Sequence, residues 1–209
     1  MLNSVNPERV MNHKQRHGYS REIVDRLLEL GRLAYGNLPS APSLTRSQWG
    51  ALRYFARANE YSRTASAFCS FHAITPGTAS ETISSLVRLG LLQRVWSKVD
   101  RRIAHLELTE RGTEVLRADP AASLERALQE LPQEQLSAVA AGLTALAAKL
   151  ALEQHRPVFG ACDQCKYFEA GGTATGSPQQ GCRWFKVPVS PDGAAELCVG
   201  FEGRDSVHG

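Results

Sequence analysis

The sequence predicts a mostly helical protein with one small β-hairpin, followed by a loop-rich C-terminal module held together by cysteine ligands. Three observations predict this fold class. Apolar residues recur at helical spacing through most of residues 20–155, two β-prone runs flank a polar turn near residue 100, and four of the five cysteines lie in the last 48 residues. We therefore expect a flexible N-terminal arm (1–19), a helical domain (20–156) and a four-cysteine module (157–209).

The first helices carry recognisable start and stop signals. Ser20 can cap a helix whose apolar positions run from Ile23 to Leu33, and prolines with a glycine mark the following segment as a loop. Thr45 can cap a second helix, which places Trp49, Leu52 and Phe55 on one side. A short third helix is expected over 63–71.

A fourth helix and a hairpin follow. Thr75 can cap a helix that has Pro76 at its first position, runs to Leu89 and ends at Gly90. The β-prone runs 92–96 and 103–108 then flank the polar segment SKVDRR. Helix, turn, helix and basic hairpin, in this order, predict a winged helix-turn-helix with a small β-wing.

Further helices are expected over 109–118, 121–130 and 134–155. In the last of these, apolar residues step by three and four, as in a helix packed lengthwise on another helix. This heptad seam is either an intramolecular core stripe or a dimer interface, and the shortage of other helices to cover it favours long dimerisation helices. The seam consists of Leu136, Val139, Leu143, Leu146 and Leu150.

Charge and hydropathy narrow the classes of partner. Residues 44–112 carry ten Lys or Arg and five Asp or Glu, a net +5, whereas 157–209 carry a net −2, from four basic and six acidic residues. The middle segment is therefore the expected face for a polyanion. No run of about eighteen apolar residues and no secretory stretch is present, which predicts a cytoplasmic protein without a membrane span.

The fourth helix and the hairpin are the candidate DNA-reading elements. The helix opens with small hydroxylated residues that suit close approach to phosphates and bases, and the hairpin tip presents Lys98, Arg101 and Arg102. The first half of this helix contains no Arg, Lys, Asn or Gln, so bidentate base contacts are not available there. We therefore expect Thr78, Ser80, Glu81 and the wing to carry specificity, together with DNA shape.

Five motifs resemble the MarR family over residues 20–155: LTRSQW (44–49), ITPGTAS (74–80), LGLLQR (89–94), DRR (100–102) and LTERG (108–112). The resemblance implies a DNA-binding transcriptional regulator that binds a pseudo-palindromic operator as a homodimer. It also implies that a wing aspartate orients an arginine. The DNA-binding residues expected from the resemblance and the composition are Thr75, Gly77, Thr78, Ser80, Glu81, Thr82, Lys98, Asp100, Arg101 and Arg102.

The four C-terminal cysteines, Cys162, Cys165, Cys182 and Cys198, are the expected metal ligands. Four thiolates suit a 4Fe–4S cluster or a structural zinc ion. The two separated single cysteines and the interleaved aromatic residues favour the cluster, because zinc sites usually take their ligands as two short pairs. The pattern CxxCxxF…GCxxFxxxV…C is also similar to high-potential iron–sulfur proteins over about forty residues.

Three functions are open at this point. The first is a regulator that senses redox state, nitric oxide, oxygen or iron through the cluster. The second is a repressor that responds to a small aromatic ligand and has a structural zinc tail. The third is an electron-transfer protein or redox enzyme on a helix-turn-helix fold. We expect no enzyme, because no phosphate loop, nucleophile constellation or paired carboxylates are evident. Cys69 is expected to be a small core residue.

Overall fold

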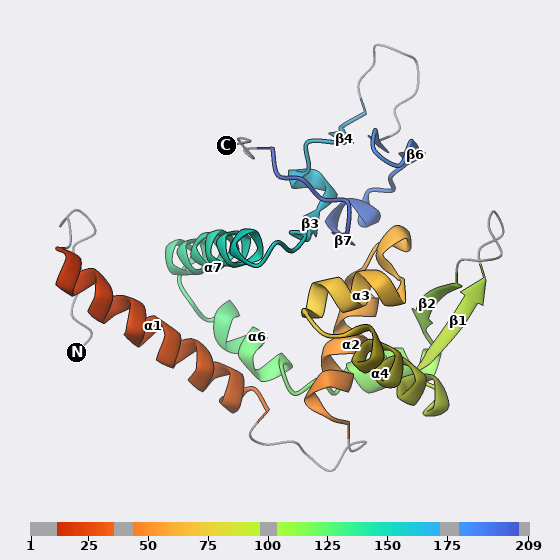
Figure 1. Ribbon diagram of the computed structural model, residues 1–209, viewed down its shortest axis with the longest axis horizontal. Coiled ribbons are helices and arrows are strands. Elements are labelled where there is room, and N and C mark those ends of the chain that lie inside the picture. Colours follow the sequence, from red (N-terminus) through yellow and green to blue (C-terminus); the bar gives the residue numbers. More distant parts are fainter. Residues whose placement is uncertain (1–11, 36–43, 97–103, 172–179, 205–209) are drawn as a thin grey trace. The chain divides into compact units, whose positions relative to one another are not determined.

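The computed structural model describes residues 12–35, 44–96, 104–171 and 180–204 (Figure 1). The chain divides into two units, Met1–Ala41 with Pro120–Glu130, and Pro42–Asp119 with Leu131–Gly209. The first unit contains α1 (His13–Leu33) and α6 (Ala122–Gln129). The other described helices and strands belong to the second unit.

The helix α1 begins eight residues earlier than the sequence analysis expected, so Ser20 is an interior residue and not its cap. Asn12 caps the helix: its side chain accepts a hydrogen bond from the Gln15 backbone N–H, and the Gln15 side chain accepts one from the Asn12 backbone N–H. This capping box satisfies two backbone donors that a helix start otherwise leaves unpaired. The segment from His13 onward is therefore helical and is not part of a flexible arm.

The winged helix-turn-helix has the predicted element order (Figure 1). It consists of α2 (Arg46–Arg57), η1 (Glu60–Ser62), α3 (Ala65–His72), α4 (Pro76–Arg88), β1 (Leu92–Trp96), β2 (Ala104–Leu108) and α5 (Glu110–Leu116). Strands β1 and β2 pair antiparallel, with Leu92 opposite Leu108 and Trp96 opposite Ala104. The predicted caps Thr45 and Thr75 are confirmed, and Thr109 caps α5.

One apolar core joins these elements. The side chains of Trp49, Leu52 and Phe55 on α2 are almost fully buried, as the sequence predicted. They share the core with Tyr54 of the same helix and with residues of α3, α4, the turn after α4 and the hairpin, chiefly Phe68, Ile83, Leu86, Leu91, Leu92 and Leu106. This core fixes α4 and the hairpin relative to each other.

Helix α7 (Gln133–Glu153) has no buried residue in this single chain. Its expected seam is solvent-exposed: Val139, Leu143, Leu146 and Leu150 expose 39–45% of their surface. By length and composition alone this helix is apolar enough to cross a membrane, which the sequence analysis did not expect. A helix whose apolar residues follow a heptad spacing is also typical of helix–helix association.

The C-terminal part of the second unit is built from very short elements. They are β3 (Gly160–Ala161), η2 (Cys162–Gln164), β4 (Phe168–Glu169), β5 (Gly181–Cys182), β6 (Val187–Pro188), η4 (Asp192–Ala195) and β7 (Leu197–Cys198). β3 pairs with β7, and β4, β5 and β6 form a second small sheet. Leu197 also forms a parallel bridge with Ala58, so this module is hydrogen-bonded to the winged helix.

Candidate nucleic-acid interface and four-cysteine site

The N-terminus of α4 is a cluster of threonine hydroxyls. Thr75 Oγ1 accepts a hydrogen bond from the Thr78 backbone N–H at 3.2 Å and lies 2.9 Å from Thr78 Oγ1. Both side chains are exposed, as are Gly77, Ser80 and Glu81. Because the positive end of a helix and its free N–H groups favour anions, this end of α4 suits a phosphate or a base edge.

Thr82 differs from the other predicted α4 residues. Its side chain is only 9% exposed, and its hydroxyl donates a hydrogen bond to the Thr78 carbonyl at 2.9 Å. Together with Ala79, Ile83 and Leu86 it lies on the buried stripe of the helix. This placement contradicts a direct DNA contact by Thr82, because base contacts need an exposed side chain.

The wing residues Lys98, Asp100, Arg101 and Arg102 lie outside the described residues. At the base of the hairpin, however, the structure adds a basic residue that the sequence analysis did not single out. Arg94 on β1 is exposed and lines a hollow of about 200 Å³ together with Ser80 of α4. Alternation along β1 gave no signal for it, because Leu92 and Arg94 lie on the same face of the strand and only Leu92 is buried.

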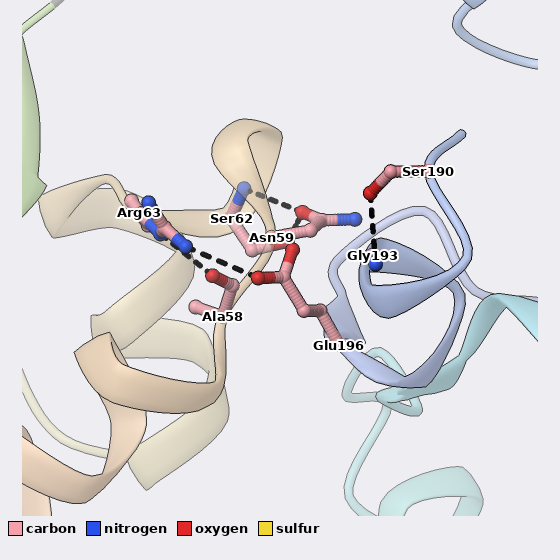
Figure 2. Close-up of polar contacts among 7 residues, drawn as sticks. All are labelled: Ala58, Asn59, Ser62, Arg63, Ser190, Gly193 and Glu196. Atoms are coloured by element: carbon pink, nitrogen blue, oxygen red, sulfur yellow. Dashed lines mark hydrogen bonds and ion pairs between the residues drawn. The ribbon is translucent and has the colours of Figure 1, made fainter. Parts of the chain in front are cut away.

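Two of the basic residues counted in this segment have structural partners. Arg53 forms a 2.7 Å ion pair with Asp119 at the end of α5. Arg63 forms a 3.2 Å ion pair with Glu196 of the C-terminal module and donates a hydrogen bond to the Ala58 carbonyl (Figure 2). The net charge of residues 44–112 therefore overstates the positive charge that is available to a polyanion.

The four predicted cysteine ligands come from four places in the C-terminal module. Cys162 starts η2, Cys165 follows it, Cys182 ends β5 and Cys198 ends β7. The backbone N–H of Cys165 donates to the Cys162 carbonyl at 2.9 Å, which closes the CxxC turn. All four are free thiols; Cys162, Cys165 and Cys198 are buried and Cys182 is half-buried. Cys69 is also free and its Sγ donates to the Ile74 carbonyl.

The pKa of Cys162 is influenced by the other three predicted ligands. A hydrogen bond with Cys198, followed by burial and the nearby Cys182 and Cys165 sulfurs, raises the pKa of Cys162. The same bond is the main cause that lowers the pKa of Cys198 to about 6, and the Asn59 side chain and the Gly200 backbone lower it further.

The space beside these sulfurs exceeds what one small ion or water requires. A cavity of about 140 Å³ is lined by Cys162, Cys182 and Cys198, with Asn59 and Tyr61 of the winged helix on another side. A cavity of roughly 10–15 Å³ already admits one water molecule. Among the described residues, no three His, Cys, Asp or Glu side chains lie close enough together to hold a single metal ion. Three of the four predicted ligand residues therefore line one cavity, and Cys165 is not among its lining residues.

The fold has known counterparts. Residues 43–103 match the family model described as MarR family. A MarR family protein from Bacillus stearothermophilus has a TM-score of 0.53 and 18% identity, covering 68% of this chain and 99% of that chain. AbsC, a MarR family transcriptional regulator from Streptomyces coelicolor, has a TM-score of 0.51 and 22% identity, covering 68% of this chain and 97% of that chain. No curated protein sequence matches this chain.

The fold and this family match define the class: the second unit contains a winged helix-turn-helix with the fold of the two MarR family structures, and its residues 43–103 match the MarR family model. More particularly, residues 43–103 are the MarR-like segment, from the start of α2 to the wing. About a third of this chain lies outside each of the two structural matches.

Proposed function

We propose that the protein is a cytoplasmic transcriptional regulator that binds a pseudo-palindromic DNA operator as a homodimer. The observation that carries this proposal is the exposed hydroxyl-rich N-terminal half of α4, fixed by a buried core beside a basic hairpin of a MarR-type domain. Thr75, Gly77, Thr78, Ser80 and Glu81 would approach bases and phosphates in the major groove. Lys98, Asp100, Arg101 and Arg102 would contact the flanking groove.

The exposed apolar seam of α7 supports the homodimer. In a single chain the seam residues Val139, Leu143, Leu146 and Leu150 are exposed to water. Helix α1 also has no buried residue, and its apolar side chains Ile23, Leu28 and Leu33 are exposed as well. Contiguous exposed apolar faces of this kind mark association surfaces. A second copy of the chain supplies two more such helices, as a two-fold symmetric operator requires.

DNA binding is tested with duplexes selected from a random pool by the purified protein. Replacing Arg101 and Arg102 by Ala should weaken binding by about tenfold or more and reduce the salt slope by about 2, because two phosphate or groove contacts are lost. A matched control replaces Arg183 and Lys186, two basic residues of the acidic module, by Ala. Equal affinities and slopes for both double variants would contradict the proposed interface.

We further propose that Cys162, Cys165, Cys182 and Cys198 hold an iron–sulfur cluster, with 4Fe–4S as the expected type. The support is that all four are free thiols and that three of them, Cys162, Cys182 and Cys198, line one cavity of about 140 Å³. Such a cluster supplies an electron-accepting centre that is sensitive to oxidants, nitric oxide and iron supply. The chain's own contribution is to exclude water with buried sulfurs and the rings of Tyr61 and Phe185. The alternative, an aromatic-ligand repressor with a zinc tail, is supported by no observation on the described residues.

The cofactor is tested by anaerobic purification followed by iron, acid-labile sulfide and zinc analysis with a visible spectrum. We expect about four iron and four sulfide per chain, and loss of both when Cys198 is replaced by Ser. Cys69→Ser is the matched control, because Ser can keep the hydrogen bond to the Ile74 carbonyl while lying in α3. One zinc per chain and no visible absorption would replace the cluster with a structural metal.

The sensing role requires that the cluster changes operator affinity. The cysteine module is hydrogen-bonded to the connection between α2 and α3, so a change at the sulfurs reaches the helix-turn-helix directly. We expect operator affinity to differ between oxidised, reduced or cluster-free protein by about 5-fold or more, the usual scale of allosteric coupling. Identical affinities in all states would leave a DNA-binding regulator without cluster sensing.

A further inference from the structure

The connection between α2 and α3, residues 58–63, is hydrogen-bonded to the last strand of the cysteine module. The Asn59 backbone N–H donates to the Leu197 carbonyl at 2.9 Å, and the Val199 N–H donates to Ser62 Oγ at 2.8 Å. The two module residues stand immediately before and after the last predicted cysteine ligand. A displacement of that ligand in β7 therefore strains the hydrogen bonds of the connection.

Arg63 joins this connection to three elements (Figure 2). Its side chain donates to the Ala58 carbonyl at the end of α2 at 2.7 Å and forms a 3.2 Å ion pair with Glu196 of the module. Both charged side chains are half-buried, which limits the screening of their attraction by water. The Arg63 backbone carbonyl accepts a 2.7 Å hydrogen bond from the N–H of Leu106 in β2. One residue thus contacts the end of α2, the cysteine module and the wing.

The strand β2 is the part of the wing that this bond holds. Leu106 is buried and lies opposite Arg94 of β1 in the hairpin. The proposed groove contacts stand between β1 and β2 in the sequence, so the base of the hairpin limits where they can reach. On the module side, Leu197 pairs with Ala161 of β3, next to Cys162. A series of hydrogen bonds thus runs from β3 through β7 and the connection to the wing.

We propose that Arg63 is a positioning residue for the wing and that Glu196 makes its position depend on the cysteine site, so that the form with an occupied cysteine site binds the operator more tightly. This inference rests on the proposed DNA binding and on the proposed group at the cysteines. It goes beyond both, because it names the contact that joins them and the direction of the effect.

The direction follows from the construction of the module. Its strands have two residues each, so a group bound by the cysteines is what holds β7 in place. With β7 in place, Glu196 fixes the Arg63 side chain and the wing is preorganised for DNA. Without the bound group, β7 is released, and the operator must order the wing at a cost in affinity. By reciprocity, the operator also tightens the binding of the group.

Glu196→Ala is the decisive variant, because charge alone predicts the opposite result. Removing an acidic residue makes the protein more positive and by itself strengthens binding to a polyanion. A weaker operator complex is therefore the signature of the lost contact with Arg63. Glu169→Ala is the matched control: it removes the same charge from the same module and breaks a 3.5 Å ion pair with Arg183, which stays within the module.

The first measurement is the operator affinity of the full-length protein, once with iron and sulfide loaded at the cysteines and once after a chelator has removed the metal. We expect the loaded parent protein and loaded Glu169→Ala to bind at least about 5-fold more tightly than their metal-free forms. Loaded Glu196→Ala should bind like the metal-free parent protein. Equal ratios in all three proteins, or weaker binding by the loaded parent protein, overturn the inference.

The second measurement needs no DNA and so separates this inference from the proposed function. Hydrogen exchange of the Leu106 amide reports on its bond to the Arg63 carbonyl. Loading the cysteines should slow this exchange at least about 5-fold in the parent protein and in Glu169→Ala, and not in Glu196→Ala. Unchanged exchange in the parent protein overturns the inference even if the protein binds DNA.

Two further outcomes are distinguished by the same measurements. Slowed exchange in a protein without operator binding supports the link from the cysteines to the wing and rejects the DNA-binding proposal instead. If the chain takes up zinc and no iron, the zinc-loaded protein is the occupied form in both measurements, and the same results support or overturn the inference. A chain that takes up neither metal has no occupied form, which overturns the inference together with the cofactor proposal.

Discussion

At the scale of single residues, the LTERG motif has a clear physical basis. Thr109 caps α5 by accepting a hydrogen bond from the Gly112 N–H at 3.0 Å, and its hydroxyl donates to the Gly90 carbonyl at 2.6 Å. This bond fastens α5 to the turn after α4, where Gly90 has a left-handed φ of 67°. A Cβ at Gly112 would overlap the Leu91 carbonyl oxygen. The motif therefore fixes α5 directly against the start of the wing.

Gly112→Ala should lower the free energy of unfolding by about 1–3 kcal/mol, because α5 must move away from Leu91 to make room. Denaturant unfolding measures the change. Gly18→Ala is the control, since Gly18 lies in α1 with no atom within 4 Å of an added Cβ and Ala favours the helix. A Gly112→Ala protein as stable as the control would contradict the close approach.

At the scale of elements, α7 is a helix of apolar composition that is exposed to solvent in the single chain. It is an apolar helix of 21 residues that buries none of them within one chain. Leu152 is 76% exposed and lies outside the heptad seam, whereas the seam residues are each less exposed. The helix therefore has one continuous face for association and a second side that tolerates water.

Leu143→Glu should weaken the dimer by at least about tenfold, because it places a charge without a partner in an apolar helix–helix interface. Sedimentation equilibrium over a range of concentrations measures the dissociation constant. Leu152→Glu makes the same substitution on the same helix outside the seam, and its dissociation constant should stay near that of the parent chain. Equal weakening by both variants would show that the seam is not the interface.

At the scale of the whole molecule, the second unit joins the winged helix-turn-helix to the cysteine module through polar and aromatic contacts. The rings of Tyr61 and Phe185 stack with centroids 4.3 Å apart and planes inclined by 10°. Phe159 adds edge contacts to Tyr54 and Phe71. The two parts are therefore expected to unfold together as one cooperative unit.

A double-mutant cycle tests this cooperation. Tyr61→Ala and Phe185→Ala should show a coupling free energy of about 0.5–1.5 kcal/mol, the usual value for an aromatic pair. Trp184→Ala is the matched control, because Trp184 packs on Tyr167 inside the module at 5.1 Å. Its coupling to Tyr61→Ala should be close to zero. A single unfolding transition should persist in the parent chain, and two separate transitions would contradict a joint unit.

The sequence was informative wherever the signal is local. Caps such as Thr45 and Thr75 and the stop at Gly90 depend on a few neighbouring residues, so they predicted the helix-turn-helix well. The start of α1 was missed although Asn12 and Gln15 form a recognisable capping box. The burial of Thr82 was also predictable, because it shares a three- and four-residue spacing with Ala79 and Leu86.

The sequence analysis did not predict the contact between the winged helix-turn-helix and the cysteine module. The bonds from Arg63 to Glu196 and from Val199 to Ser62 join residues 133 and 137 positions apart. No local pattern marks Asn59 as a neighbour of a cysteine, because its sequence reads as an ordinary turn. Contacts of this range depend on tertiary packing, which periodicity and capping rules do not describe.

The long-range hydrogen bonds between residues 59–62 and residues 197–199 can form only late in the synthesis of the chain. Residues 58–63 leave the ribosome long before residues 196–199, so the early-made turn lacks its permanent hydrogen-bond partners until the late strand is translated. Contacts across such separations form slowly because a long loop must close first. Residues 58–63 therefore reach their final hydrogen-bonded state only after all four C-terminal cysteines have been made.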